Sequence, residues 1–166
     1  MILRLSKALM VCAIAFFTSL VVFGNVTDYN TNFQFVHHVF MMDTIPPEAS
    51  IHYRAINSNL IHNLGYIGIM SLEFLTALLC WIGGIKMLLS VKASAKAFKS
   101  SKTVAIAGLT IGFLVWQVAF MSVGGEWFGM WMSKQWNGVP DAFRFFITII
   151  MVLLYIIQPD GELEKD

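Results

Sequence analysis

Charged residues are scarce in this sequence. Lys, Arg, Asp and Glu make up 13% of its 166 residues, whereas hydrophobic residues make up 57%. Soluble domains have roughly 25% charged residues, and a small soluble fold buries only part of its chain. The excess apolar surface is therefore expected to face lipid. A net charge of +1 gives no electrostatic reason to expect a nucleic-acid partner.

Cysteine is also rare, and the common enzyme motifs are missing. Cys12 and Cys80 both lie inside apolar runs, so we interpret them as small buried hydrophobic residues. The sequence has no GxxxxGK[ST] loop, no GxSxG elbow and no GxGxxG fingerprint. We therefore assign no catalytic residue and predict that the protein is not an enzyme.

Four long apolar runs dominate the chain. About 20 apolar residues are needed for a helix to cross a bilayer, and the runs lack the alternation of barrel strands. We predict an all-α fold, a four-transmembrane-helix bundle in one membrane domain over 1–166. The predicted helices cover about 8–24, 64–89, 103–123 and 141–158.

The first run raises the alternative of a cleaved signal peptide, because Arg4 and Lys7 precede it. No small-x-small cleavage site follows it, so we expect a retained first helix.

Lysine is concentrated in one short loop, 90–102, which holds Lys92, Lys96, Lys99 and Lys102. Short loops rich in Lys and Arg stay on the cytoplasmic side. This pattern predicts that both termini are cytoplasmic, and we expect the acidic tail PDGELEKD to be a solvated end. The loops 25–63 and 124–140 then face outward.

The two outer loops are rich in aromatic residues, and we expect segments 30–60 and 124–140 to form a structured periplasmic cap. The second loop carries Glu126, Trp127, Trp131 and Trp136. Tryptophan prefers the headgroup level of a membrane, so an interfacial anchor is the simpler interpretation. Alternatively, GGEWFGMW dips toward the bundle and lines a site.

All four histidines fall in the first outer loop, at His37, His38, His52 and His62. His37, His38 and Asp43 are weak metal-ligand candidates, because adjacent residues cannot point the same way and no HxxxH spacing occurs. Ordinary hydrogen bonding is the favoured role for the histidines, His62 included. No histidine lies at the depth that a haem between helices requires, so we predict neither a metal nor a haem cofactor.

Glu73 is the most informative single residue, because it lies about 13 Å inside the second predicted helix at 1.5 Å per residue. A charged carboxylate there needs a partner. We predict an intramembrane polar cluster of Glu73, Gln117 and Arg144. Helix-to-helix adhesion is its simpler role, and proton or ion handling is the alternative.

Small residues indicate close helix packing. Gly108 and Gly112 form a GxxxG pattern on the third predicted helix. The pattern favours a tight bundle or a homo-oligomer.

Three motifs resemble one bacterial family of small integral membrane proteins of unknown function. They are NFQFVHHVFMMDT at 32–44, HNLGYIGIMSLEFLTALLC at 62–80, and SVGGEWFGMWMSKQWNG at 122–138 followed by AFRFF at 142–146. The resemblance implies a four-helix inner-membrane protein and no activity. The matching positions include His38, Asp43, Glu73, Gly125, Glu126, Trp127 and Arg144.

Taken together, these patterns favour a non-enzymatic accessory subunit that docks a membrane protein or lipid through its aromatic face. A small-molecule, ion or proton conduit centred on Glu73 is the alternative. A metal- or haem-binding redox subunit is the third hypothesis.

Overall fold

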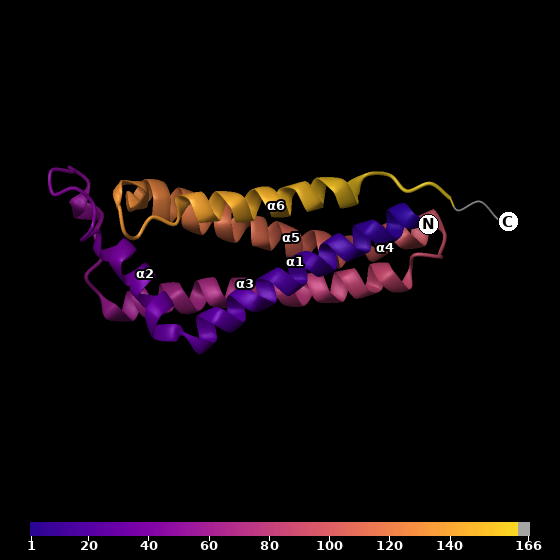
Figure 1. The fold of residues 1–166 in the computed structure, drawn as a ribbon, viewed down its shortest axis with the longest axis horizontal. Coiled ribbons are helices and arrows are strands. Elements are labelled where there is room, and N and C mark those ends of the chain that lie inside the picture. The colour runs from indigo at the N-terminus through magenta and orange to yellow at the C-terminus, as the bar shows by residue number, and fades with distance from the viewer. Residues whose placement is uncertain (163–166) are drawn as a thin grey trace.

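The computed structural model describes residues 1–162, and every regular element in that part of the chain is helical. Figure 1 shows a long bundle with its connecting segments gathered at the two ends. The elements are α1 (Ile2–Thr27), α2 (Tyr29–Met41), the 3₁₀-helix η1 (His52–Arg54), α3 (Asn59–Leu89), α4 (Ala95–Ser101), α5 (Thr103–Leu114), the π-helix η2 (Val115–Trp127), the 3₁₀-helix η3 (Met130–Met132) and α6 (Val139–Ile157).

Four helical stretches are long and apolar enough, by length and composition, to cross a membrane. They cover 2–27, 59–89, 95–127 and 139–157. The third stretch consists of α4, α5 and η2 placed end to end. The predicted all-helical fold is therefore confirmed, with four helices apolar enough to span a membrane, and the first three helices extend beyond their apolar runs.

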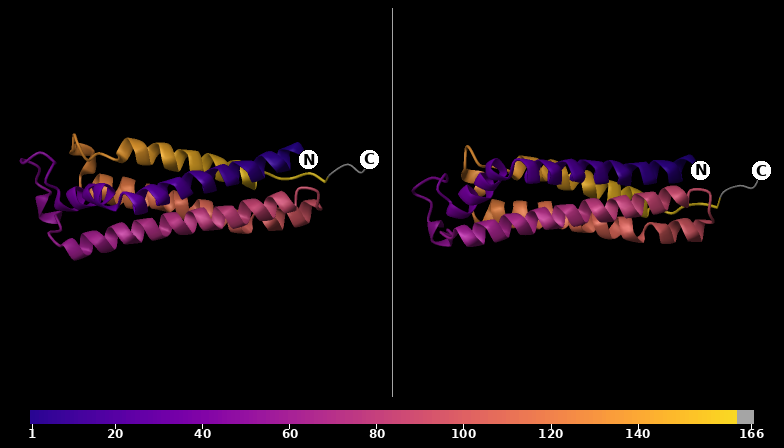
Figure 2. Two further views of the ribbon diagram at one scale, coloured as in Figure 1. Left: turned by 60° about the horizontal axis from the view of Figure 1, so that its bottom comes forward. Right: turned by 90° about the horizontal axis from the view of Figure 1, so that it is seen from below.

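Helix α3 is the centre of the bundle. It packs against α1 and α5, and α5 packs in turn against α6 (Figures 1 and 2). A Cβ on Gly83 of α3 would lie 2.4 Å from the backbone nitrogen of Ala105. A Cβ on Gly108 would lie 2.9 Å from the backbone nitrogen of Cys80, and Gly112 meets the same helix. The predicted GxxxG glycines thus lie at a contact within the chain, where only glycine lets the backbones approach this closely.

The segments expected to be outer loops carry more helix than the sequence indicated. Helix α1 continues through Thr27, and α2 follows almost at once. Helix α3 begins at Asn59, five residues before the predicted start of the second apolar helix. There the Ser58 hydroxyl caps the helix by accepting from the Ile61 N–H at 3.5 Å.

The two outer segments contact each other at one end of the bundle, opposite the N-terminus (Figure 1). The Thr44 and Ser133 hydroxyls lie 2.8 Å apart. A second small apolar core joins the segments, separate from the main core of the bundle. Its buried members are Val39, Met42, Ile45, Phe128 and Met130.

The opposite end of the bundle carries the lysine-rich segment, and part of it forms α4. Asp160 lies buried there and pairs with Lys7 at 2.8 Å and with Lys102. Burial opposes ionisation of this carboxyl group, but the hydrogen bonds from Lys102 and Lys7 outweigh it and hold the pKa of Asp160 below its usual value. A fully solvated tail is therefore wrong for residues 159–162; residues 163–166 lie outside the described residues.

Candidate functional site: a cavity above Glu73

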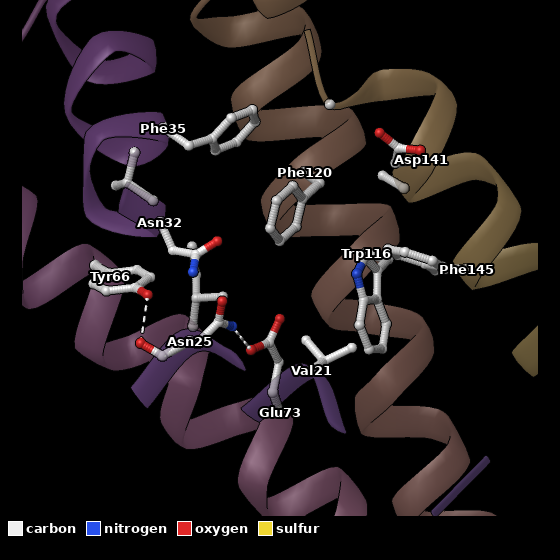
Figure 3. Close-up of a pocket in the computed structure, with 14 residues that line it drawn as sticks. Val21, Asn25, Asn32, Phe35, Tyr66, Glu73, Trp116, Phe120, Asp141 and Phe145 are labelled. Carbon is white, nitrogen blue, oxygen red and sulfur yellow. Dashed lines mark hydrogen bonds between the residues drawn. The ribbon is translucent and has the colours of Figure 1, made fainter. Parts of the chain in front are cut away.

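A cavity of about 210 Å³ lies inside the bundle near its outer-segment end. Five elements enclose it: α1, α2, α3, η2 and α6. Figure 3 shows the lining side chains pointing toward a common space, with Glu73 at one end and Asp141 at the other. The cavity thus brings together residues from nearly the whole chain.

Glu73 forms the floor of this cavity and is only 2% exposed. Its Oε2 accepts a 2.7 Å hydrogen bond from the side-chain amide of Asn25 on α1. The Tyr66 hydroxyl donates to the backbone carbonyl of Asn25 at 3.0 Å (Figure 3). This chain of bonds fixes the position of the carboxyl group and joins α1 to α3.

The second carboxyl oxygen of Glu73, Oε1, has no hydrogen-bond partner in residues 1–162, and Glu73 lines the cavity. Among residues 1–162, no buried side-chain nitrogen or oxygen lacks a hydrogen-bond partner. The partner found for Glu73 bonds to Oε2, so Oε1 must be open to the cavity rather than fully buried. Figure 3 shows it directed away from Asn25.

Aromatic rings form the walls. Trp116 on η2 packs edge-on against Phe145 of α6, with ring centroids 5.5 Å apart. Phe120 stacks on Phe35 of α2 at 6.2 Å. The faces of such rings carry negative potential, which attracts a cation placed over them.

The π-helix η2 supplies two of the rings of that wall, Trp116 and Phe120. Its hydrogen bonds run from residue i to i+5, so its turns are wider than those of an α-helix. Its buried positions fall in two pairs nine residues apart, Val115 with Trp116 and Gly124 with Gly125. Trp116 therefore faces the cavity, and Gln117 is turned aside and only partly buried.

The predicted polar cluster of Glu73, Gln117 and Arg144 does not form. Glu73 bonds to Asn25. Arg144 pairs with Asp141, three residues earlier on α6, where both side chains are largely exposed. At i, i+3 spacing, Arg144 pairs with Asp141 while its guanidinium stays exposed. Extending the guanidinium into the bundle would cost the free energy of desolvating the charge.

Beyond Glu73, away from the cavity, the contact between α3 and α5 is close-packed. Thr76 and Cys80 of α3 are fully buried. A Cβ on Gly112 would lie 2.8 Å from Thr76 Cγ2. The cavity therefore does not continue between α3 and α5, whereas a separate cavity of about 560 Å³ lies between α1 and α6.

Three of the histidines form side-chain hydrogen bonds with another titratable residue. His38 Nδ1 lies 2.8 Å from the Asp43 carboxylate, and His37 Nδ1 lies 2.9 Å from His62 Nδ1. His62 Nε2 lies 2.6 Å from the Ile56 carbonyl and must donate to it, so a neutral His62 accepts from His37 at Nδ1. Burial, reinforced by His62 and His38, lowers the pKa of His37.

Metal binding by these residues is not favoured by their arrangement. Within residues 1–162, no three His, Cys, Asp or Glu side chains are grouped as a metal site requires. That the protein carries no metal and no haem stays a prediction.

The tryptophans of the second outer segment point different ways. Trp127 is 52% and Trp131 55% exposed, and Glu126 is exposed beside them. Trp136 stacks on His38, with ring centroids 4.8 Å apart. Phe128 and Met130, not the tryptophans, fill the interior of the segment.

Several residues of the cavity were not among the sequence candidates. Asn25 follows directly on the first apolar run and was assigned to a loop. The continuation of α1 to Thr27 places it inside the helix instead. An asparagine at the end of a span, at a similar depth to Glu73 on the next span, is the signal that could have identified the pair.

Fold and cavity together define a class: a helical integral membrane protein with four candidate spans and an internal, aromatic-walled cavity. Over residues 3–159 the chain matches the model of the family described as "predicted small integral membrane protein (DUF2165)", and it belongs to that family. This confirms the resemblance drawn from its motifs. The comparisons with curated proteins and with solved structures gave no match.

Proposed function

We propose that this protein binds a small amphipathic ligand in the cavity above Glu73. The ligand has a positively charged or hydrogen-bond-donating head and a compact apolar body. The observation that carries the proposal is the free Oε1 of Glu73, which is open to a cavity of about 210 Å³. That volume corresponds to about seven waters at ~30 Å³ each.

The chemistry of the lining selects this class of ligand. A carboxylate removed from water gains most from a cation or a strong donor, because the local dielectric constant is low. The rings of Trp116, Phe120 and Phe145 favour the same cation and also bury an apolar body. Asp141 at the opposite end of the cavity is already paired with Arg144, so Glu73 is the carboxyl group left for the ligand.

Binding from one side fits the geometry better than passage through the bundle. Between α3 and α5, the layers beyond Glu73 are packed with glycine against the neighbouring helix. The lysine pattern of the sequence supports placing the cavity on the outer side of the membrane, which is the periplasmic side in the bacterial inner membrane that the resemblance implies. A conduit that runs from Glu73 between α3 and α5 would require these packed layers to separate.

A fluorescence titration of the purified protein tests this function, since Trp116 lines the cavity. Choline is titrated beside its neutral isostere 3,3-dimethylbutanol. Choline is expected to bind, and Glu73→Gln to weaken its binding at least tenfold, because glutamine keeps the acceptor for Asn25 but loses the charge. Glu126→Gln, at an exposed carboxylate, is the matched control. Equal binding of the two ligands, or equal loss in the two variants, contradicts the proposal.

The second candidate is a non-enzymatic accessory role in which the outer end docks another membrane protein. Tyr53, Trp127 and Trp131 are all more than half exposed there. Arg54 links two of them, with its guanidinium 4.7 Å from the Trp127 ring centroid and 5.4 Å from that of Tyr53. Large aromatics with arginine are the residues most often found at the centre of protein interfaces.

Pull-down from membranes in a mild detergent, followed by mass spectrometry, tests the accessory role. A membrane protein retained by the natural chain is expected to be lost from the Trp127→Ala/Trp131→Ala variant. It should be kept by Phe23→Ala, which removes an exposed aromatic from the side of the bundle. Retention by both variants would contradict docking at this end.

A further inference from the structure

A larger cavity, of about 720 Å³, lies at the lysine-bearing end of the bundle. It is enclosed by α4, the first turn of α5, the end of α6 and residues 158–160. Neither the cavity above Glu73 nor the outer segments contribute to it. Its role is therefore independent of the function proposed above.

Positive charge dominates this end. Among the described residues, seven cationic side chains lie at this end with two carboxylates. The cationic residues are Arg4, Lys7, Lys86, Lys92, Lys96, Lys99 and Lys102, and the acidic residues are Asp160 and Glu162. Both carboxylates have partners, so the excess is positive.

Those partners leave two lysines of the cavity for a ligand. Asp160 is held between the buried Lys7 and Lys102. Glu162 accepts from the backbone N–H of Ala95 at 3.1 Å. Lys96 and Lys99 line the cavity, are exposed, and pair with no acidic side chain in residues 1–162.

The polar face of the cavity follows the helical repeat. Lys96, Lys99, Ser100 and Thr103 stand at i, i+3, i+4 and i+7 and so share one side of the helix. The Ser100 and Thr103 hydroxyls each donate to a carbonyl one turn earlier, at 3.1 Å. The ammonium groups are therefore the donors that remain, and they suit a doubly or singly charged oxyanion.

Apolar residues complete the wall on the side of the membrane helices. Ile106 of α5 and Ile157 of α6 line the cavity, and Ile157 is 50% exposed on the side of the bundle. Both belong to helices of membrane-spanning length. The cavity therefore passes from a cationic surface to an apolar one, in the same order as a phospholipid passes from its head group to its acyl chains.

We propose that this basic cavity binds the phosphate of an anionic phospholipid, with the head group on Lys96 and Lys99 and an acyl chain along Ile106 and Ile157. A free phosphate ester offers the same oxyanion but makes no use of the apolar wall. Each lysine near an anionic membrane surface contributes roughly 1 kcal/mol, equivalent to about fivefold in binding. Two lysines at one head group thus distinguish anionic lipid from zwitterionic lipid by at least tenfold.

Native mass spectrometry of the full chain, released from nanodiscs of equal phosphatidylglycerol and phosphatidylcholine, tests the site. Preferential retention of one phosphatidylglycerol is expected. Lys96→Gln/Lys99→Gln should reduce that retention about tenfold. Lys86→Gln/Lys92→Gln removes the same charge from the same end outside the cavity and should leave it unchanged. All four lysines are exposed, so both variants are expected to fold, and size-exclusion chromatography checks this.

Two outcomes overturn the proposal. Equal loss in the two double variants would mean that bulk surface charge, not the cavity, attracts the lipid. Displacement of the lipid by millimolar glycerol 3-phosphate would identify a soluble phosphate ester as the ligand.

Discussion

The side-chain amide of Asn25 donates a 2.7 Å hydrogen bond to the carboxyl group of Glu73, 48 residues away on another membrane-length helix. The bond supplies the partner that a carboxyl group inside a bundle requires. It occupies one carboxyl oxygen and leaves the other open to the cavity. One contact therefore both joins α1 to α3 and orients the group proposed to bind a ligand.

Removal of that partner is expected to destabilise the bundle. Asn25→Leu leaves the Glu73 carboxyl group without its donor and should lower the free energy of unfolding by about 1–3 kcal/mol. Asn32→Leu is the control, because Asn32 lines the same cavity but donates only to backbone carbonyls, that of Asp28 at 2.9 Å and that of Gly24 at 3.4 Å. Unfolding in a mixed-detergent titration measures the difference, and equal effects of the two variants would contradict the role given to Asn25.

A methyl group at the α3–α5 contact is expected to force the helices apart. Gly83→Ala places a Cβ 2.4 Å from the Ala105 nitrogen, a backbone atom that cannot move alone. Overpacking of this kind costs typically about 1–3 kcal/mol. Gly68→Ala, on the same helix with nothing within 4 Å of the added Cβ, should be neutral or stabilising. Thermal unfolding in detergent compares the two, and a Gly83→Ala protein as stable as Gly68→Ala would show that the contact is loose.

Neutralising the buried carboxylate Asp160 at the lysine end is expected to destabilise the protein more than neutralising the exposed carboxylate Asp141. Asp160→Asn leaves Lys7 and Lys102 buried without their counter-ion, which costs about 3–5 kcal/mol. Asp141→Asn breaks a pair with Arg144 whose side chains are both more than half exposed, so it should cost about 1 kcal/mol or less. Chemical unfolding of the two variants tests this order, and the reverse order would refute it.

The pair formed by His37 and His62 predicts that the stability of the outer-segment end of the bundle depends on pH. The pKa of His37 lies below its ordinary 6.5 in the folded protein, chiefly through burial and then through His62 and His38. As the pH falls, His37 takes up a proton more readily in the unfolded segment than in the folded one. The stabilising effect of neutral His37 is therefore fully present above about pH 6.5. It is lost as the pH falls through the lowered pKa.

Hydrogen exchange of the α2 amides, corrected for the intrinsic rate at each pH, measures this effect. Protection is expected to decline between pH 7.5 and pH 5 in the natural chain and to become independent of pH in His37→Gln. His52→Gln is the control, since His52 bonds instead to the Pro46 carbonyl at 3.1 Å. A decline that persists in His37→Gln would assign the titration to another group.

The sequence alone determined the four membrane-length helices, because an apolar run of about 20 residues has few alternatives to a helix in lipid. It also identified Glu73 as a buried carboxyl group and the outer segments as more than loops. The motifs at 32–44, 62–80 and 122–146 were enough to indicate the family. Each of these conclusions depends on composition or local order, which a sequence shows directly.

Only the tertiary structure decided which residues meet. The partner of Glu73 is Asn25, and not Gln117 or Arg144, for two reasons. Trp116 lines the cavity from η2 whereas Gln117 does not, and α1 continues past its apolar run far enough to include Asn25. Asp160 likewise lies between two lysines from distant segments. Helix phase and end-to-end length depend on packing across the whole bundle, and no local pattern of residues encodes them.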